Sequence, residues 1–216
     1  MTRALVVAKA PVPGRVKTRL GAEVGMDAAA EVAAAALLDT LAACRTAFGP
    51  ADCLLALSGD LGDAVRGPEI ESALAGWHVF RQRGDDLGAR LAHAHADVPE
   101  GPPVLQVGMD TPQLAVEHLY DGAAALDEAD AVLGPAGDGG WWLLGLRHPA
   151  AAAALRGVPM STPTAYDDTR RALEDRGLLV ATAGVLCDVD TVADAELVAR
   201  GHRETEFARA WVEVGR

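Results

Sequence analysis

The sequence predicts an α/β fold in which a mostly parallel sheet is covered by helices on both faces. Short apolar runs alternate with longer Ala- and Leu-rich stretches from one end of the chain to the other. Such alternation implies crossover connections between parallel strands. Aromatic residues make up only 4% of the chain, and Ala, Val and Leu supply most of its apolar mass. That bias suits helices packed on a parallel sheet better than an aromatic-rich β sandwich.

We expect seven strands and seven helices. The expected strands cover residues 4–9, 53–58, 78–82, 103–108, 130–134, 141–146 and 178–182. The expected helices cover residues 26–47, 62–75, 87–97, 113–127, 149–155, 163–176 and 191–213, the last with room for a break at Gly201. The run 141–146 follows the preceding strand after only a glycine-rich turn, so it can run antiparallel and make the sheet mixed.

Length, charge and cysteine usage exclude several classes of protein. A chain of 216 residues that is 50% hydrophobic can bury a sizeable core, and we expect a single domain over residues 1–216. The net charge of -12 disfavours nucleic acid as a partner. Three widely spaced cysteines without a CxxC pair indicate a reducing compartment. The chain lacks an apolar run long enough for a signal peptide or a membrane span, so we expect a cytoplasmic protein.

The first loop gathers cations on this acidic chain. The apolar run 4–8 leads into Lys9-Ala10-Pro11-Val12-Pro13-Gly14-Arg15-Val16-Lys17-Thr18-Arg19-Leu20. Arg15, Lys17 and Arg19 alternate, so in an extended loop they can face one side and surround a polyphosphate. The spacing is not that of a GxxxxGK[ST] P-loop. The alternative is a solvated turn with scattered basic residues.

A carboxylate follows the fourth expected strand. The apolar run ends at Gly108, and Asp110 is then held in a tight turn before Pro112. A carboxylate at the carboxyl end of a parallel strand is well placed to hold a divalent cation that bridges phosphate oxygens. The alternative is that Asp110, or Thr111 beside it, caps the next helix.

Asp188 and Asp190 form a second acidic pair near the end of the chain. They lie two residues apart, so in an extended segment they face the same way and can complete a metal site with Asp110. Alternatively, one of the two acids, or Thr191, caps the last helix.

Two further polar turns are candidate binding loops. In Gly134–Trp141, glycines around Asp138 allow a close backbone approach to a ligand, and the Asp-Gly pair equally favours a hairpin turn. In Gln82–Arg90, the glycines and the amide side chain can read a flat heterocycle, or Asp85 or Asp86 caps a plain strand-to-helix loop. His93 and His95 are two apart on an expected helix and point to different faces, which does not suit a metal pair.

These segments resemble, in order, the sequence blocks of a bacterial glycosyltransferase-A-like family of unknown function. The first block is Ala8–Leu20, and the others are Gln82–Arg90, Gly108–Leu114, Gly134–Leu146, Ser161-Thr162-Pro163 and Asp188–Thr191. The resemblance covers nearly the whole chain. Met109 and Thr111 depart from the small residues usual there, and Trp141-Trp142 replaces a tyrosine pair.

The resemblance implies the nucleotide-diphospho-sugar transferase (GT-A) type of fold, a three-layer α/β/α sandwich with a mixed sheet. It also implies kinship with the phospholactate and molybdenum-cofactor guanylyltransferases. By this resemblance, Asp110 with Asp188 or Asp190 would hold Mg²⁺ or Mn²⁺. The acceptor would face Asp138, Gly139, Gly140 and Trp141. The nucleotide would contact residues of three blocks: Ala8, Lys9, Ala10, Pro11, Gly14, Arg15, Lys17, Arg19, Gln82, Gly84, Leu87, Gly88, Gly108 and Met109.

The favoured function is metal-dependent nucleotidyl transfer to a phosphorylated acceptor, with Arg15, Lys17 and Asp110 as the catalytic residues. An alternative is glycosyl transfer from a nucleotide-diphospho-sugar, which has less need of a cationic opening loop. A third candidate is a nucleotide-binding module without catalysis. The expected partners are a nucleotide or nucleotide sugar and a small-molecule acceptor, with no nucleic acid and no membrane span, and a homodimer is compatible with this expectation.

Overall fold

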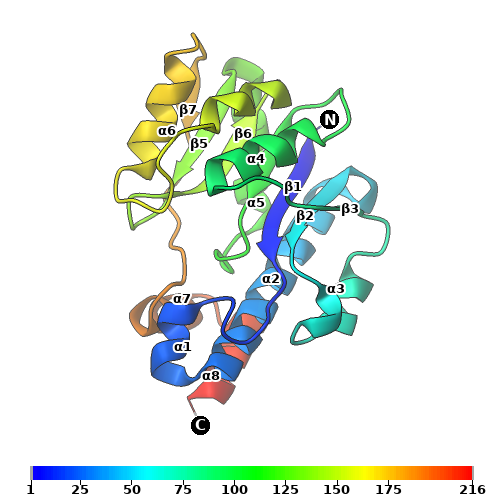
Figure 1. The fold of residues 1–216 in the computed structure, drawn as a ribbon, viewed down its shortest axis with the longest axis vertical. Helices are drawn as coiled ribbons and strands as arrows, with labels where there is room; N and C mark the ends of the chain where they lie inside the picture. Colours follow the sequence, from blue (N-terminus) through cyan, green and yellow to red (C-terminus); the bar gives the residue numbers. More distant parts are fainter. Residues whose placement is uncertain (1, 216) are drawn as a thin grey trace.

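The computed structural model describes residues 2–215, whose strands form one mixed sheet with the order β3-β2-β1-β4-β6-β5-β7 (Figure 1). The strands are β1 (Arg3–Lys9), β2 (Cys53–Ser58), β3 (His78–Arg81), β4 (Val104–Val107), β5 (Ala131–Pro135), β6 (Trp141–Leu146) and β7 (Val180–Thr182). All seven expected strands are confirmed to within two residues at either end. Their near-continuous apolar runs suit a sheet that is buried on both faces.

β6 is the antiparallel member of this sheet. It pairs antiparallel with β4 and with β5, whereas the other neighbouring strands pair in parallel. The short turn between β5 and β6 leaves no room for a crossover, so the second strand must fold back. The prediction of a mixed sheet is therefore confirmed, and the carboxyl ends of β1, β2, β3, β4, β5 and β7 share one edge.

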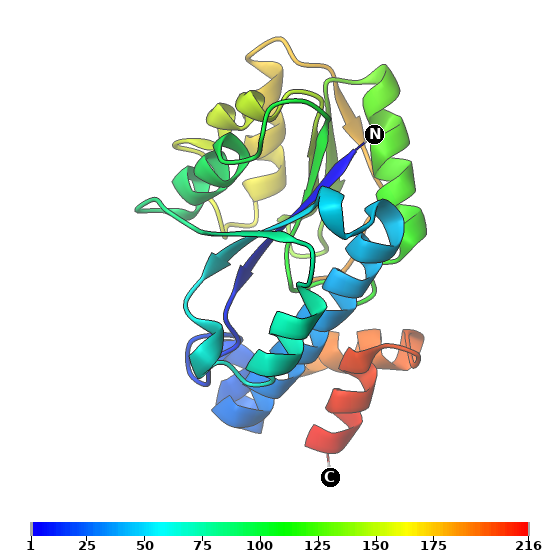
Figure 2. The same ribbon diagram turned by 90° about the vertical axis from the view of Figure 1, so that its right-hand side faces the viewer.

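Helices cover both faces of the sheet, as Figure 2 shows. α2 and α5 lie on one face, and α4, η3 and α6 lie on the other. The helices are α1 (Thr18–Val24), α2 (Met26–Phe48), α3 (Gly67–Ala73), α4 (Leu87–Ala96), α5 (Val116–Glu128), α6 (Ala165–Glu174), α7 (Val192–Gly201) and α8 (Glu206–Val214), with 3₁₀ turns η1 (Pro50–Asp52), η2 (Leu61–Asp63) and η3 (Pro149–Leu155). None of the helices described is long and apolar enough to cross a membrane.

Several helix expectations need correction. The segment 149–155 is a 3₁₀ helix, whereas the break expected at Gly201 is confirmed, because α7 ends there and α8 begins at Glu206. The expected helix 62–75 shortens to α3 because Arg66 has a left-handed backbone (φ 55°), which a helix interior does not accept. α1 was not expected at all, since the helix was predicted to begin only after Gly25.

The lower part of the molecule is a helical cluster that stands beyond the carboxyl edge of β1. There α1, α7 and α8 pack around α2 (Figure 1) and enclose a second apolar core that includes Leu20, Val32, Val198 and Phe207. Because α1 begins directly after the first loop, this core fixes the end of that loop relative to the sheet.

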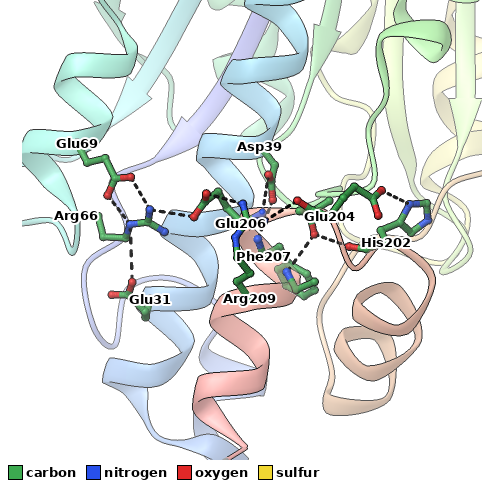
Figure 3. A network of polar contacts seen from close by, with 11 residues as sticks. Glu31, Asp39, Arg66, Glu69, His202, Glu204, Glu206, Phe207 and Arg209 are labelled. Carbon is green, nitrogen blue, oxygen red and sulfur yellow. Dashed lines mark hydrogen bonds and ion pairs between the residues drawn. The ribbon is translucent and has the colours of Figure 1, made fainter.

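A polar network holds α8 and α3 to α2 (Figure 3). Asp39 of α2 accepts hydrogen bonds from the backbone N–H groups of Glu206 (2.9 Å) and Phe207 (2.8 Å), and so caps α8 from another helix. Arg66 lies within 4.0 Å of the carboxylates of Glu31, Glu69 and Glu206, one from each helix. The network therefore ties the carboxy-terminal helix to the loop that precedes α3.

Candidate functional site

Three loops from distant parts of the chain meet at the carboxyl edge of the sheet, around the ammonium group of Lys17. Nζ of Lys17 lies 2.6 Å from Oδ1 of Asp110 and 3.0 Å from Oδ1 of Asp190. Asp110 follows β4, while Asp190 belongs to the segment between β7 and α7. The structure thus brings together one cation and two carboxylates that the sequence analysis placed in one site.

The backbone at Lys17 decides where its side chain goes. Lys17 is the residue before the first turn of α1 and has a left-handed conformation (φ 45°, ψ 43°). Only Lys17, Arg66 and Ser161 share a positive φ among the non-glycine residues described. This conformation costs about 1–3 kcal/mol and persists only where the surroundings enforce it.

The expectation that Arg15, Lys17 and Arg19 face one side of an extended loop is wrong. The left-handed turn at Lys17 and the start of α1 at Thr18 end the extended backbone there, although Lys17 and Arg19 still contact the same carboxylate, that of Asp190. The Lys17 side chain is only 6% exposed, whereas that of Arg19 is 78% exposed and lies 3.5 Å from Oδ2 of Asp190. Arg15 makes neither of these contacts and instead lines a hollow together with Ser58 and Asp60.

The charges around Lys17 favour its protonated form. Burial by itself would lower the pKa of Lys17, but the carboxylates of Asp110 and Asp190 raise it above its usual range. Lys17 is therefore a permanent cation at any ordinary pH, and it offsets part of the negative charge of the acidic loops.

Asp110 and Asp188 hold the two acidic loops together. The backbone N–H of Val189 donates to the carbonyl oxygen of Asp110 (2.9 Å), and the hydroxyl of Thr111 donates to Oδ1 of Asp188 (2.9 Å). Gln113 adds a hydrogen bond to the carbonyl of Cys187 (2.7 Å). These contacts make the loop after β4 and the segment before α7 one unit.

The positions at which α5 and α7 begin show which of the candidate residues cap these two helices. α5 begins at Val116, so neither Asp110 nor Thr111 caps it. Thr191 caps α7 by accepting from the N–H of Asp194, and Asp194 in turn accepts from the N–H of Thr191. The expectation that one acid of the pair Asp188 and Asp190 caps this helix is therefore wrong, and both carboxylates face the site.

The donor chemistry of this site fits a hard divalent cation. Asp110, Asp188 and Asp190 offer carboxylate oxygens, and the ammonium of Lys17 already stands between two of them as a positive ion would. Burial raises the pKa of Asp188 to about 6, and the nearby Asp110 adds to this, while the hydrogen bond from Thr111 and the charge of Lys17 act in the opposite direction. Among the residues described, however, no three acidic, His or Cys side chains converge on one point, so a metal would require a local rearrangement.

The glycine-rich turn between β5 and β6 is a hairpin, as one of the two interpretations held. Oδ1 of Asp138 accepts from the N–H of Gly140 (2.8 Å) and leaves the exposed side of its carboxylate to solvent. Gly139 has a φ of 90°, and a Cβ there would lie 2.1 Å from the carbonyl oxygen of Pro163. The indole N–H of Trp141 donates to Thr169 (3.1 Å), so this half-buried ring is anchored to α6.

The loop after β3 has mainly structural contacts. Asp86 caps α4 by accepting from the N–H of Ala89 (2.7 Å), as one alternative predicted. Nε2 of Gln82 donates to the backbone carbonyls of Ala8 (2.8 Å) and Ala56 (2.9 Å), which joins this loop to β1 and β2. A Cβ at Gly88 would lie 2.4 Å from the carbonyl of Leu155, so this glycine allows α4 to pack closely on η3.

The other residues expected to contact a nucleotide divide by exposure. The side chains of Ala8, Ala10, Pro11 and Met109 are buried, so only their backbone could face a ligand; Lys9, Gly14 and Leu87 are exposed, and Gly84 and Gly108 are intermediate. The backbone N–H of Lys9 donates to Sδ of Met109 (3.3 Å), which fastens the first loop to the loop after β4.

A shallow hollow of about 100 Å³ adds residues that the sequence analysis missed. It lies between the first loop and the loop after β2, and its polar lining combines Lys9 and Arg15 with Ser58, Asp60 and Asp63. The segment Ser58-Gly59-Asp60 contains the carboxyl end of the parallel strand β2, and that position was the signal that could have identified it.

His93, His95, Cys44 and Cys53 lie outside this site. His95 is 1% exposed and is hydrogen-bonded to Gln106 (3.1 Å), while His93 contacts the carbonyl of Arg83, so the two do not form a metal pair. Cys44 and Cys53 are buried free thiols, and burial raises the pKa of Cys53 to about 12. Cys187, directly before Asp188, is a free thiol that is only partly buried.

The sheet order, the antiparallel β6 and the acidic loops at the carboxyl edge define a GT-A-like protein of the nucleotide-diphospho-sugar transferase superfamily, as the sequence resemblance implied. The chain belongs to the family described as "Uncharacterized protein conserved in bacteria (DUF2064)", whose model matches residues 40–162. No curated protein matches this sequence significantly.

Solved structures support this assignment of the fold. A proposed nucleotide-diphospho-sugar transferase from Desulfovibrio desulfuricans is 29% identical, with a TM-score of 0.82 over 98% of this chain and 92% of that one. The 4-diphosphocytidyl-2C-methyl-D-erythritol synthase of Anaerococcus prevotii is 12% identical, with a TM-score of 0.59 over 100% of this chain and 99% of that one. A CMP:2-keto-3-deoxy-manno-octonic acid synthetase complexed with CTP is 15% identical, with a TM-score of 0.56 over 94% and 99%. At such identities, the last two establish the fold alone.

Proposed function

We propose that this protein is a divalent-metal-dependent nucleotidyltransferase that joins a nucleoside monophosphate unit to a phosphorylated small molecule. The observation that carries the proposal is the meeting of Lys17, Asp110 and Asp190 at the carboxyl edge of the sheet. Ligands of open α/β sheets bind at that edge. The fold is shared with a synthase and a synthetase that by name form cytidyl products, one of them complexed with CTP.

In the proposed reaction, an oxygen of the acceptor's phosphate forms a bond to the α-phosphorus of a nucleoside triphosphate. The bond from that phosphorus to the β-phosphate oxygen breaks, and pyrophosphate leaves with the bonding electrons. Such chemistry depends on positioning and charge neutralisation more than on a protein nucleophile. A bound Mg²⁺ or Mn²⁺ would supply positive charge to the phosphate oxygens, held by Asp110 with Asp188 or Asp190.

The cations of the first loop would take the phosphates of the donor. Arg15 and Lys9 are exposed beside the hollow of about 100 Å³, where a guanidinium can grip two phosphate oxygens at once. Lys17 would reach the triphosphate only after leaving its two carboxylates. Gln82 and Gly88 are proposed to line the base, and the exposed Asp138 with Gly139 and Gly140 to face the acceptor.

Glycosyl transfer from a nucleotide-diphospho-sugar is the second candidate. Two observations favour it: the protein from Desulfovibrio desulfuricans is proposed to be such a transferase, and Lys17 is held by carboxylates instead of being presented to a triphosphate. A nucleoside-diphosphate sugar has fewer phosphates to neutralise, so replacement of Lys17 should matter less for it than for a triphosphate.

A thermal-shift screen of nucleoside triphosphates and nucleotide sugars, each with and without Mg²⁺, tests both candidates. We expect a nucleoside triphosphate to raise the melting temperature in the presence of Mg²⁺. A response restricted to nucleotide sugars would promote glycosyl transfer. Binding that needs no metal and leads to no turnover would indicate a binding module, and the absence of any shift would contradict all three.

A further inference from the structure

The chain uses lysine twice, and the two residues stand in opposite environments. Of its 19 basic residues, only Lys9 and Lys17 are lysines. Lys9 is exposed, whereas the side chain of Lys17 is 6% exposed. The two carboxylates that Lys17 bridges remain open, with side chains 44% exposed at Asp110 and 43% at Asp190. The cation is thus covered, while the acids that hold it face solvent.

We propose that Lys17 is a resident counter-ion: its ammonium group occupies the place of a divalent cation between Asp110 and Asp190, and leaves that place when Mg²⁺ or Mn²⁺ binds. The inference rests on the proposed metal–nucleotide site and assigns to Lys17 a role other than that of a fixed phosphate ligand.

The geometry favours exchange over joint occupancy. Nζ of Lys17 contacts Oδ1 of Asp110 at 2.6 Å and Oδ1 of Asp190 at 3.0 Å. A divalent cation on the same carboxylates would stand within a few ångströms of the ammonium, in a half-buried region where like charges repel strongly. Oδ2 of Asp190 already faces Arg19 at 3.5 Å, which adds to the positive charge around a cation placed beside Lys17. The lysine must therefore withdraw for the metal to bind tightly.

The choice of lysine at this position suits such an exchange. Arginine, which the chain uses seventeen times, can hold carboxylates with its rigid guanidinium fork. The lysine ammonium is a compact, strongly hydrated point charge on a flexible stem, so it can leave one set of oxygens for another. On release, the ammonium would lie at the edge that carries Arg15 and Arg19, where the proposed site receives phosphates.

The wild-type protein offers a direct test, because lysine labelling yields two side-chain signals. With ¹³C-labelled lysine and Mg²⁺ alone, without nucleotide, we expect the Lys17 side-chain resonance to shift and that of Lys9 to stay. Acetic anhydride should modify Lys17 at least fivefold faster once Mg²⁺ is present, as read by mass spectrometry. If calorimetry shows that Mg²⁺ binds while Lys17 does not respond, the exchange is wrong.

Two substitutions at one position should change metal affinity in opposite directions. Lys17→Met removes the competitor and should tighten Mn²⁺ binding about tenfold, measured by electron paramagnetic resonance. Lys17→Arg should weaken it by at least tenfold, because a guanidinium holds both carboxylates more firmly. Arg176→Met, at an exposed arginine after α6, is the matched loss of one positive charge and should leave Mn²⁺ binding unchanged. If Lys17 had only a structural role, Lys17→Met and Lys17→Arg would not change the Mn²⁺ affinity in opposite directions.

Failure of this inference differs from failure of the proposed function. Exchange of Lys17 by Mg²⁺, without binding of any nucleotide, would leave the counter-ion role standing and overturn the proposed function. Nucleotide binding that requires Mg²⁺ but leaves Lys17 in place would support the proposed function and overturn the counter-ion role. If neither wild type nor Lys17→Met binds Mn²⁺, the inference is overturned.

Discussion

The hydroxyl of Thr111 donates a hydrogen bond to Oδ1 of Asp188 at 2.9 Å, across 77 residues of chain. Thr111 is 3% exposed, and it belongs to the same turn as Asp110. Asp188 has a raised pKa because it is largely buried, and this hydrogen bond opposes that rise. The contact therefore stabilises both the ionised carboxylate and the junction of the two acidic loops.

Replacing Thr111 by valine should lower the free energy of unfolding by about 2 kcal/mol, because a hydrogen bond to a charged group is lost without a change of shape. Urea unfolding at pH 7 measures the loss. Thr46→Val is the matched control, since that exposed hydroxyl bonds only within its own helix, to the carbonyl of Ala42. Equal effects of the two substitutions would contradict the assigned contact.

Asp39→Ala should release the carboxy-terminal helix. The Asp39 carboxylate caps α8 through the N–H groups of Glu206 and Phe207, and loss of a cap costs about 1–2 kcal/mol. We expect faster cleavage between α7 and α8 in limited proteolysis, together with a lower melting temperature. Asp121→Ala removes an exposed acid from α5 and should change neither measurement.

Gly139 and Gly137 should respond very differently to alanine. At Gly139 a Cβ would meet the carbonyl of Pro163 at 2.1 Å on a backbone with a φ of 90°, whereas at Gly137 nothing lies within 4 Å. Gly139→Ala should therefore cost more than about 2 kcal/mol of stability, and Gly137→Ala less than about 0.5 kcal/mol. Chemical denaturation of both variants measures the two free energies of unfolding. A small loss of stability in Gly139→Ala would show that this turn does not depend on contact with Pro163.

Stability should fall in acid because of His95. Burial lowers the pKa of His95 to about 4, below the ordinary value of about 6.5, so the unfolded chain binds the proton between these values and the folded chain does not. The stabilising effect of a neutral His95 is complete above about pH 6.5, and it declines as the pH falls toward 4, by on the order of 3 kcal/mol.

Urea unfolding at several pH values measures this decline. His95→Gln, whose amide can still donate to Gln106, should remove most of it. His93→Gln on the same helix should preserve it, because His93 is only half-buried and contacts a backbone carbonyl. If the free energy of unfolding of His95→Gln still falls with pH in the same way, a group other than His95 is responsible for the decline.

Local patterns were sufficient to predict the sheet. The strands 53–58 and 141–146 are found where expected, since unbroken apolar runs between polar turns are local signals, and the antiparallel β6 followed from the short turn before it. α1 escaped prediction because its seven residues show little periodicity, and its stability comes from the packing of Leu20 in the core that α7 and α8 complete.

Within the candidate site, the sequence by itself determined which loops lie at the binding edge and which charged residues they carry. Only the tertiary structure decided that Arg15 and Arg19 stay exposed, and that Lys17 is buried against Asp190, 173 positions away. The physical reason is that strand ends are set by local apolar runs, whereas the position of an ammonium group depends on a left-handed turn and on carboxylates supplied by distant loops.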